Sequence, residues 1–231
     1  MTDDAGGRTV TRASVRTLDR AALWLMHATV VSSIVMQIGK GDFLPPKVSM
    51  SQYGVGPFGW TFTITLILLA AGSMTMAIAD LRRFPPPPRA VTILIAIWAV
   101  GVVLTGLVPA DPDQSIPTLA GRAHTLFASL ALIVLPIAAV IRVTMARRQP
   151  PKPLRITICV LAFASELSLG LLVLAATGID ITGLGPHSAW ALYESSSVVL
   201  DVVLIYLMCM VARISVVVPA RAEVVARTSM P

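Results

Sequence analysis

The stretch AVTILIAIWAVGVVLTGLV, residues 90–108, decides the fold of this protein. It holds nineteen residues in a row without a charged side chain. As an α-helix it is about 28 Å long, close to the roughly 30 Å thickness of the hydrocarbon core of a bilayer. The stretch therefore predicts a helix that spans a membrane.

Five further apolar runs of similar length occupy residues 21–38, 58–79, 123–141, 156–177 and 188–211. The chain of 231 residues is 55% hydrophobic and only 13% charged, with a mean hydropathy of +0.80. Soluble globular domains carry about 25% charged residues, so this composition excludes a soluble fold. The sequence predicts an all-α fold, a polytopic transmembrane bundle of six helices.

The positive charges of the chain predict its orientation in the membrane. Fifteen of the eighteen basic residues lie in four segments: residues 1–20, 82–89, 142–155 and 213–231. The other three, Lys40, Lys47 and Arg122, lie in the connections that alternate with these segments. Lysine and arginine favour the cytoplasmic side of a membrane, so both termini are expected there. The net charge of +6 is thus explained by topology, and no nucleic-acid partner is expected.

The domain organisation follows from this topology. We expect a basic cytoplasmic tail over residues 1–20, a six-helix membrane domain over 21–212, and a second cytoplasmic tail over 213–231. The expected location is the inner (plasma) membrane of a bacterial cell. The lipid bilayer is then the first partner of the protein. A homo-oligomer and a complex with another membrane protein both stay open.

Two proline-rich segments, RRFPPPPRA (residues 82–90) and RRQPPKPLR (147–155), separate pairs of apolar runs. Proline has no N–H for a helix and favours extended backbone, so both segments predict helix ends. The alternative is recognition by a proline-binding module. We expect stiff spacers whose arginines anchor at the lipid headgroups.

The connection GLVPADPDQSIPTLAGRAH, residues 106–124, gathers charged side chains at the predicted outer surface. Asp111, Asp113 and His124 are weak candidates for metal ligands, and a metal with an open coordination position activates water. The alternatives are a ligand-binding surface and a polar turn in which Arg122 pairs with an aspartate. An enzyme at this surface stays open, but no metal site and no catalytic residue are assigned.

Three short motifs follow one another along the chain: SQYGVGPFGW (residues 51–60), GLVPADP (106–112) and GRAHTL (121–126). With the hydropathy pattern, they resemble the bacterial integral membrane family known as domain of unknown function 998. The resemblance covers most of the chain and implies a six-helix membrane protein without an assigned activity. It also implies that the motif positions form one shared element at the outer face: Ser51, Tyr53, Gly54, Gly59, Trp60, Asp111, Gly121 and His124.

Three acidic residues interrupt the last two apolar runs. Glu166 lies near the middle of the fifth run. Glu194, Ser197 and Asp201 lie in the sixth at spacings of three and four, which puts them on one face of a helix. An ionised carboxylate at the bilayer centre costs roughly 2.5–3.5 kcal/mol, so these side chains are expected to face the interior of the bundle.

No lysine or arginine is expected at the depth of these acids. Their carboxyl groups are then either protonated, or paired with a cation or with His27 of the first run. Protonated carboxyls bonded to Ser165 and Ser168 predict a purely structural role. The other pairings predict a proton or cation relay, or a pocket for a cationic or amphiphilic ligand.

No cofactor is predicted, and haem in particular is not expected. Bis-histidine ligation needs two histidines at one depth on facing helices. His27 lies toward the cytoplasmic side, whereas His124 and His187 lie near the outer surface. There His187 is expected to lie close to the motif positions and to Asp113 and Arg122, and we call this set the outer-face cluster. Neither outer histidine shares its helix with a second one.

Three classes of function remain. The favoured one is binding or transport of a small or amphiphilic ligand, or of protons, through an intramembrane pocket formed by Glu166, Glu194, Ser197, Asp201 and His27. The second is a membrane-embedded enzyme that works at the outer face through Asp111, Asp113 and His124. The third is an accessory subunit of a membrane complex without chemistry of its own.

Overall fold

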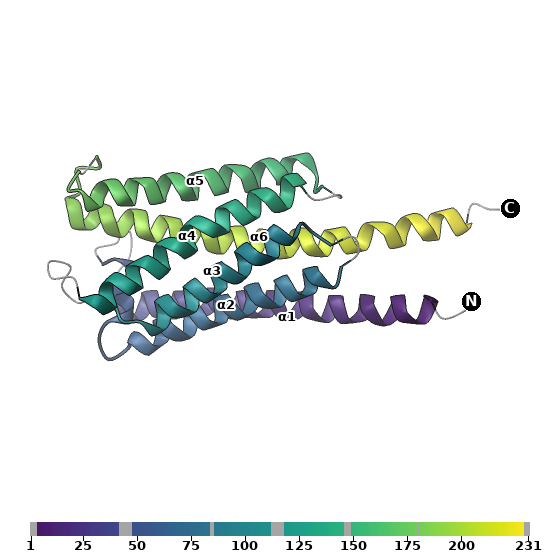
Figure 1. Cartoon of the computed structure of the whole chain (residues 1–231), viewed down its shortest axis with the longest axis horizontal. Coiled ribbons are helices and arrows are strands. Elements are labelled where there is room, and N and C mark those ends of the chain that lie inside the picture. Colours follow the sequence, from purple (N-terminus) through teal and green to yellow (C-terminus); the bar gives the residue numbers. More distant parts are fainter. Residues whose placement is uncertain are drawn as a thin grey trace.

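A computed structural model describes most of the chain (Figure 1). The described residues are 4–41, 48–83, 86–111, 118–145, 149–179 and 181–228. Among them are α-helices and one short 3-10 helix, and no β-strand. The predicted all-α fold is confirmed.

Each predicted membrane span corresponds to one long α-helix. In chain order, with the 3-10 helix labelled η1, the elements are α1 (Asp4–Lys40), η1 (Met50–Gly54), α2 (Gly59–Leu81), α3 (Arg89–Leu107), α4 (Leu119–Met145), α5 (Lys152–Ala176) and α6 (Pro186–Thr228). All six α-helices of the described residues are long and apolar enough to cross a bilayer. The protein is a multi-pass membrane protein.

The first and last helices are longer than the apolar runs that predicted them. α1 begins at Asp4, inside the segment expected to be a tail, and α6 continues to Thr228. Hydropathy marks where a helix enters lipid, but it does not mark where the backbone hydrogen bonds of that helix end. Both helices extend beyond the rest of the bundle in the same direction (Figure 1).

Consecutive helices pack side by side as antiparallel neighbours, and α6 also contacts α1, α2 and α4 (Figure 1). Both termini lie at one end of the bundle, together with the α2–α3 and α4–α5 connections. We call this the basic end. The opposite end holds η1 and the α3–α4 and α5–α6 connections. That the basic end faces the cytoplasm stays a prediction.

Prolines lie at helix boundaries on the basic end. Pro88 directly precedes α3, Pro151 directly precedes α5, and Pro153 lies in the first turn of α5. A proline there removes no helical hydrogen bond. α2 and α4 both end before the proline-rich segments, at Leu81 and Met145. The helix ends predicted from these segments are confirmed.

A layer of apolar side chains fills the half of the bundle nearer the basic end. Its members show no exposure at all: Ile95, Leu135, Ile158, Leu204, Ile205 and Met208. They come from α3, α4, α5 and α6 and belong to one continuous core. The layer separates the polar groups of the opposite end from those of the basic end.

A buried charge cluster lies between this layer and the basic end. Arg142 of α4 donates hydrogen bonds to both carboxylate oxygens of Asp80 on α2, one of them at 2.9 Å. Arg83 pairs with Asp19 of α1 and lies 3.4 Å from the Asp80 carboxylate. It also donates to the backbone carbonyl of Ala212 in α6, at 3.1 Å. The cluster therefore ties four helices together.

The placement of Arg142 in the connection between the fourth and fifth spans is wrong. The residue lies within α4, and only 5% of it is exposed. Its charge is met by Asp80, which lies one residue beyond the apolar run of the second span. Hydropathy does not show that opposite charges at the ends of two runs face each other.

Candidate functional site

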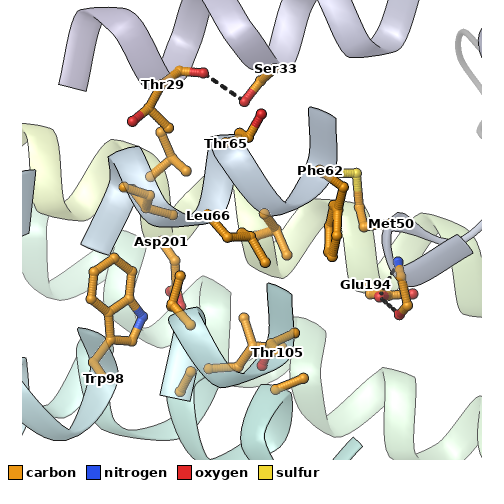
Figure 2. A pocket seen from close by; sticks show the side chains of 18 of the residues that line it. Thr29, Ser33, Met50, Phe62, Thr65, Leu66, Trp98, Thr105, Glu194 and Asp201 are labelled. Carbon is orange, nitrogen blue, oxygen red and sulfur yellow. Dashed lines mark hydrogen bonds between the residues drawn. The ribbon is translucent and has the colours of Figure 1, made fainter. Parts of the chain in front are cut away.

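Two cavities lie in the half of the bundle nearer the opposite end. The inner cavity, of about 80 Å³, is surrounded by α1, η1, α2, α3, α4 and α6. Figure 2 shows its mainly apolar wall, with Phe62, Leu66 and Trp98 beside the acids Glu194 and Asp201. The predicted acidic face of α6 therefore borders a cavity inside the bundle.

The vestibule, of about 520 Å³, lies closer to the opposite end. Its lining includes Gln52, Asp111, Arg122, His187 and Trp190, from η1, the first part of the α3–α4 connection and the first turns of α4 and α6. Two residues, Ser51 and His124, line both cavities. These two side chains stand between the vestibule and the inner cavity.

Glu194 holds η1 against α6. One carboxylate oxygen accepts hydrogen bonds from the backbone N–H of Ser51, at 3.0 Å, and from its hydroxyl. The other oxygen accepts from the indole N–H of Trp190, at 3.3 Å. Three donors thus satisfy a carboxyl group that is only 9% exposed. Glu194, the outermost acid of α6, therefore holds η1 in place at the polar end of the inner cavity.

Asp201 is bonded on one side only. Its Oδ1 accepts a hydrogen bond from the Ser165 hydroxyl of α5 at 2.7 Å, which is one of the predicted serine partners. Its Oδ2 is buried and has no hydrogen-bond partner within the described part of the chain. Ser197, one turn away, contacts the Ser165 carbonyl at 3.5 Å. Asp201 is 3% exposed, so an orphan acceptor borders the inner cavity.

His124 carries the second orphan atom. Its Nδ1 lies 2.8 Å from the backbone carbonyl of Val108. A carbonyl oxygen only accepts, so Nδ1 holds the proton and donates. In the neutral ring, Nε2 is then an acceptor; it is buried and lacks a partner among the described residues. The side chain is 4% exposed, between the two cavities.

Asp111 serves the start of α4. Its carboxylate accepts hydrogen bonds from the backbone N–H of Thr118, at 3.0 Å, and from the Thr118 hydroxyl, at 2.5 Å. The anticipated ion pair with Arg122 is not formed within the described ranges. There, no three His, Cys, Asp or Glu side chains come together as metal ligands. Asp113 lies outside the described residues.

Two motif glycines allow close backbone contacts at the opposite end. A Cβ at Gly59 would lie 2.1 Å from the carbonyl oxygen of Gly54, and one at Gly121 would lie 1.8 Å from the Asp111 carboxylate. Only glycine lets η1 rest on the start of α2, and Asp111 on the first turn of α4. These residues are therefore needed for the shape of the site.

The two motif aromatics lie away from both cavities. Tyr53 is 1% exposed and packs with Met36 and Phe62 beneath η1. Trp60 is 60% exposed, as expected for a tryptophan at the membrane interface. The first anchors η1 in the fold, and the second faces the surroundings of the bundle.

Glu166 and His27 do not line the inner cavity with the acids of α6. Glu166 is half-buried on α5 and is not among the residues that line the two cavities, although its Oε1 has no partner in the described part of the protein. His27 Nδ1 donates to the Leu23 carbonyl, so Nε2 of the neutral ring accepts a hydrogen bond from the Tyr206 hydroxyl at 3.4 Å, and the ring lies tilted beside Trp24. Of the five residues of the predicted pocket, only Glu194 and Asp201 line the inner cavity, while Ser197 faces the Ser165 carbonyl of α5.

The family described as "Protein of unknown function (DUF998)" matches residues 20–211 of the chain. The protein belongs to this family. The resemblance drawn from the three motifs is confirmed. No curated protein and no solved structure matches the chain.

The DUF998 match, residues 20–211, contains all residues that line the two cavities. Of the buried charge cluster, only Asp19 and Ala212 lie just outside the match. Hydropathy and residue spacing did not predict two features of this region. One is the Asp80–Arg142 pair. The other is Trp98, which lines the inner cavity and is 1% exposed. A tryptophan in the middle of a span, far from the interfaces where tryptophans gather, was the available signal.

Ser51→Ala is expected to lower the stability of this DUF998 protein by about 1–3 kcal/mol, because a buried carboxylate loses one of its donors. The measurement is unfolding of the purified protein by titration with a denaturing detergent. The matched control is Ser196→Ala, whose hydroxyl bonds only to the Leu192 carbonyl of its own helix. Equal effects of the two variants would contradict the role given to Glu194.

Proposed function

We propose that the protein binds a small amphiphilic molecule with a positively charged, hydrogen-bond-donating head, such as a primary ammonium, in the inner cavity. The observation that carries this proposal is the pair of orphan atoms at the cavity, Asp201 Oδ2 and His124 Nε2. In the ionised carboxylate and the neutral imidazole both atoms accept hydrogen bonds, so the group that satisfies either of them is a donor. A buried polar atom without a partner costs about 1–3 kcal/mol, which a bound donor would recover.

The charges around the cavity support a cationic head. Glu194 and Asp201 form no ion pair with a lysine or arginine in the described ranges. The nearest buried guanidinium on α4 is Arg142, which is engaged with Asp80 beyond the apolar layer. Two carboxyl groups in a largely apolar cavity favour a cation over a neutral or anionic ligand.

The size of the inner cavity limits the ligand. About 80 Å³ corresponds to roughly two or three water molecules, so only a small head with a short apolar chain fits. The vestibule offers room for the remainder of a longer molecule, with access from the opposite end. Water is the competing occupant of the inner cavity, and ligands that differ in charge and in N–H donors distinguish water from a bound ammonium.

The apolar layer supports binding from one side rather than an open channel. Leu135, Leu204 and Ile205 close the path beyond Asp201, and the charge cluster lies behind them. Passage through the bundle would require this layer to part. The proposal is therefore binding, and transport is a further step that depends on it.

Asp201→Asn is expected to weaken binding of n-butylammonium at least tenfold, because the amide replaces one acceptor by a donor and removes the charge. Binding is measured in nanodiscs by calorimetry and by the rise in Tm that ligand binding to the folded state produces. Butyltrimethylammonium has the same charge but no N–H donor, and butyrate has the opposite charge. Both are expected to bind more weakly than n-butylammonium.

The matched control is Glu166→Gln, the same exchange of carboxyl for amide on the neighbouring helix but outside the inner cavity. It should bind n-butylammonium like the wild type. Equal Tm shifts with all three compounds would mean partitioning into lipid, and the absence of any shift would leave water as the occupant. Either result would overturn the proposal and favour an accessory role.

A further inference from the structure

A third cavity lies on the outside of the bundle, between α4 and α5 at the basic end. This groove, of about 330 Å³, is lined by Thr144, Arg155, Ile156, Cys159, Val160 and Phe163. It is separate from the inner cavity and the vestibule, and shares no lining residue with them. It faces the surroundings of the bundle, which in a membrane are lipid.

The groove has one polar end and one apolar end. Arg155 lies in the first turn of α5, where it donates a hydrogen bond to the side-chain oxygen of Gln149. Val160 and Phe163 are 58% and 70% exposed and lie further along the same helix. Eight residues separate Arg155 from Phe163, about 12 Å along a helix axis. A phospholipid has this arrangement, with its phosphate at the surface and its chain below.

The charges at the polar end favour an anion. From residue 143 to residue 165 the sequence contains four basic residues and no acidic one. A guanidinium carries five N–H donors, and among the described residues Arg155 uses one of its groups on Gln149 alone. The remaining donors match phosphate oxygens, which arginine binds well.

We propose that the α4–α5 groove binds one anionic phospholipid, with Arg155 on the headgroup phosphate and the acyl chain along Val160 and Phe163. Basic pockets between transmembrane helices are sites of this kind. The site is independent of the ligand proposed for the inner cavity. It gives the α4–α5 pair a selective contact with the membrane at its basic end.

Cys159 provides the test, because it lines the groove and its thiol is free. Alkylation by N-ethylmaleimide is followed at the peptide level in mixed micelles with phosphatidylglycerol or with phosphatidylcholine. A bound chain shields the thiol, so the rate is expected to be at least threefold lower with phosphatidylglycerol. Arg155→Gln should abolish this difference, and Arg155→Lys should retain part of it.

Arg122→Gln is the matched control, since it removes an arginine at the other end of the bundle and should leave the protection unchanged. Native mass spectrometry with an equimolar lipid mixture gives an independent measurement: one phosphatidylglycerol should be retained by the wild type and lost in Arg155→Gln. If Cys159 is not alkylated by N-ethylmaleimide in either kind of micelle, lipid retention in this measurement tests the proposal alone. Equal protection by both lipids, or equal retention in the Arg155→Gln variant, would overturn the proposal.

Discussion

Replacement of Asp80 by asparagine is expected to destabilise the protein by about 3–5 kcal/mol, because it leaves a buried guanidinium without its counter-charge. Arg142 donates two hydrogen bonds to Asp80, and both side chains are almost fully buried, with 5% and 1% exposure. An asparagine keeps one acceptor but carries no charge. The Arg83–Asp19 pair, which also borders Asp80, would lose part of its support.

The measurement is the free energy of unfolding in a denaturing detergent, compared with two further variants. Glu166→Gln exchanges the same groups at a residue that forms no ion pair with the described part of the chain. A loss of stability below about 1 kcal/mol is expected there, as for sites without a special role. The double variant Asp80→Leu, Arg142→Leu removes both charges, and should cost less than Asp80→Asn alone. A single variant as stable as the wild type would show that Arg142 does not depend on Asp80.

Gly59→Ala is expected to cost about 3 kcal/mol, the upper part of the range for an added methyl in a packed site. The new Cβ would lie 2.1 Å from the Gly54 carbonyl oxygen and 2.8 Å from its carbon. These are backbone atoms, so η1 itself has to move. Ser51 moves with it, and its two hydrogen bonds to Glu194 are weakened.

Thermal unfolding measures this effect, and the fluorescence of Trp190 reports on the Glu194 junction, because the indole N–H donates to that carboxylate. Gly170→Ala is the matched control. Its Cβ would meet no atom within 4 Å, and it lies inside α5. Alanine is a better helix former than glycine. The free energy of unfolding of this variant should therefore be at least that of the wild type, with a gain of up to about 0.5–1 kcal/mol. A Gly59→Ala variant that behaves like Gly170→Ala would mean that η1 is not fixed by Glu194.

The acids of α6 show which structural features can be predicted from residue spacing and which cannot. Glu194, Ser197 and Asp201 were predicted to share one helix face, and all three are buried on it. The partner of Glu194 was not predicted, because Ser51 lies 143 residues away in sequence. Glu166 has a similar depth and chemistry, yet α5 contributes no residue to the lining of the inner cavity. Spacing within one helix fixes its faces, but not the neighbour that each face meets.

The sequence by itself determined the six membrane spans, the gathering of basic residues at the end that holds both termini, and the DUF998 family. These are local properties, since an apolar run of sufficient length satisfies its own backbone hydrogen bonds in lipid only as a helix. The tertiary structure alone decided that Asp80 meets Arg142 and that η1 is held by Glu194. It also decided that Asp201 and His124 each keep, at one cavity, an atom without a partner among the described residues. Such pairings depend on the rotation and depth of each helix against its neighbours, which hydropathy does not encode because lipid and protein interior are equally apolar.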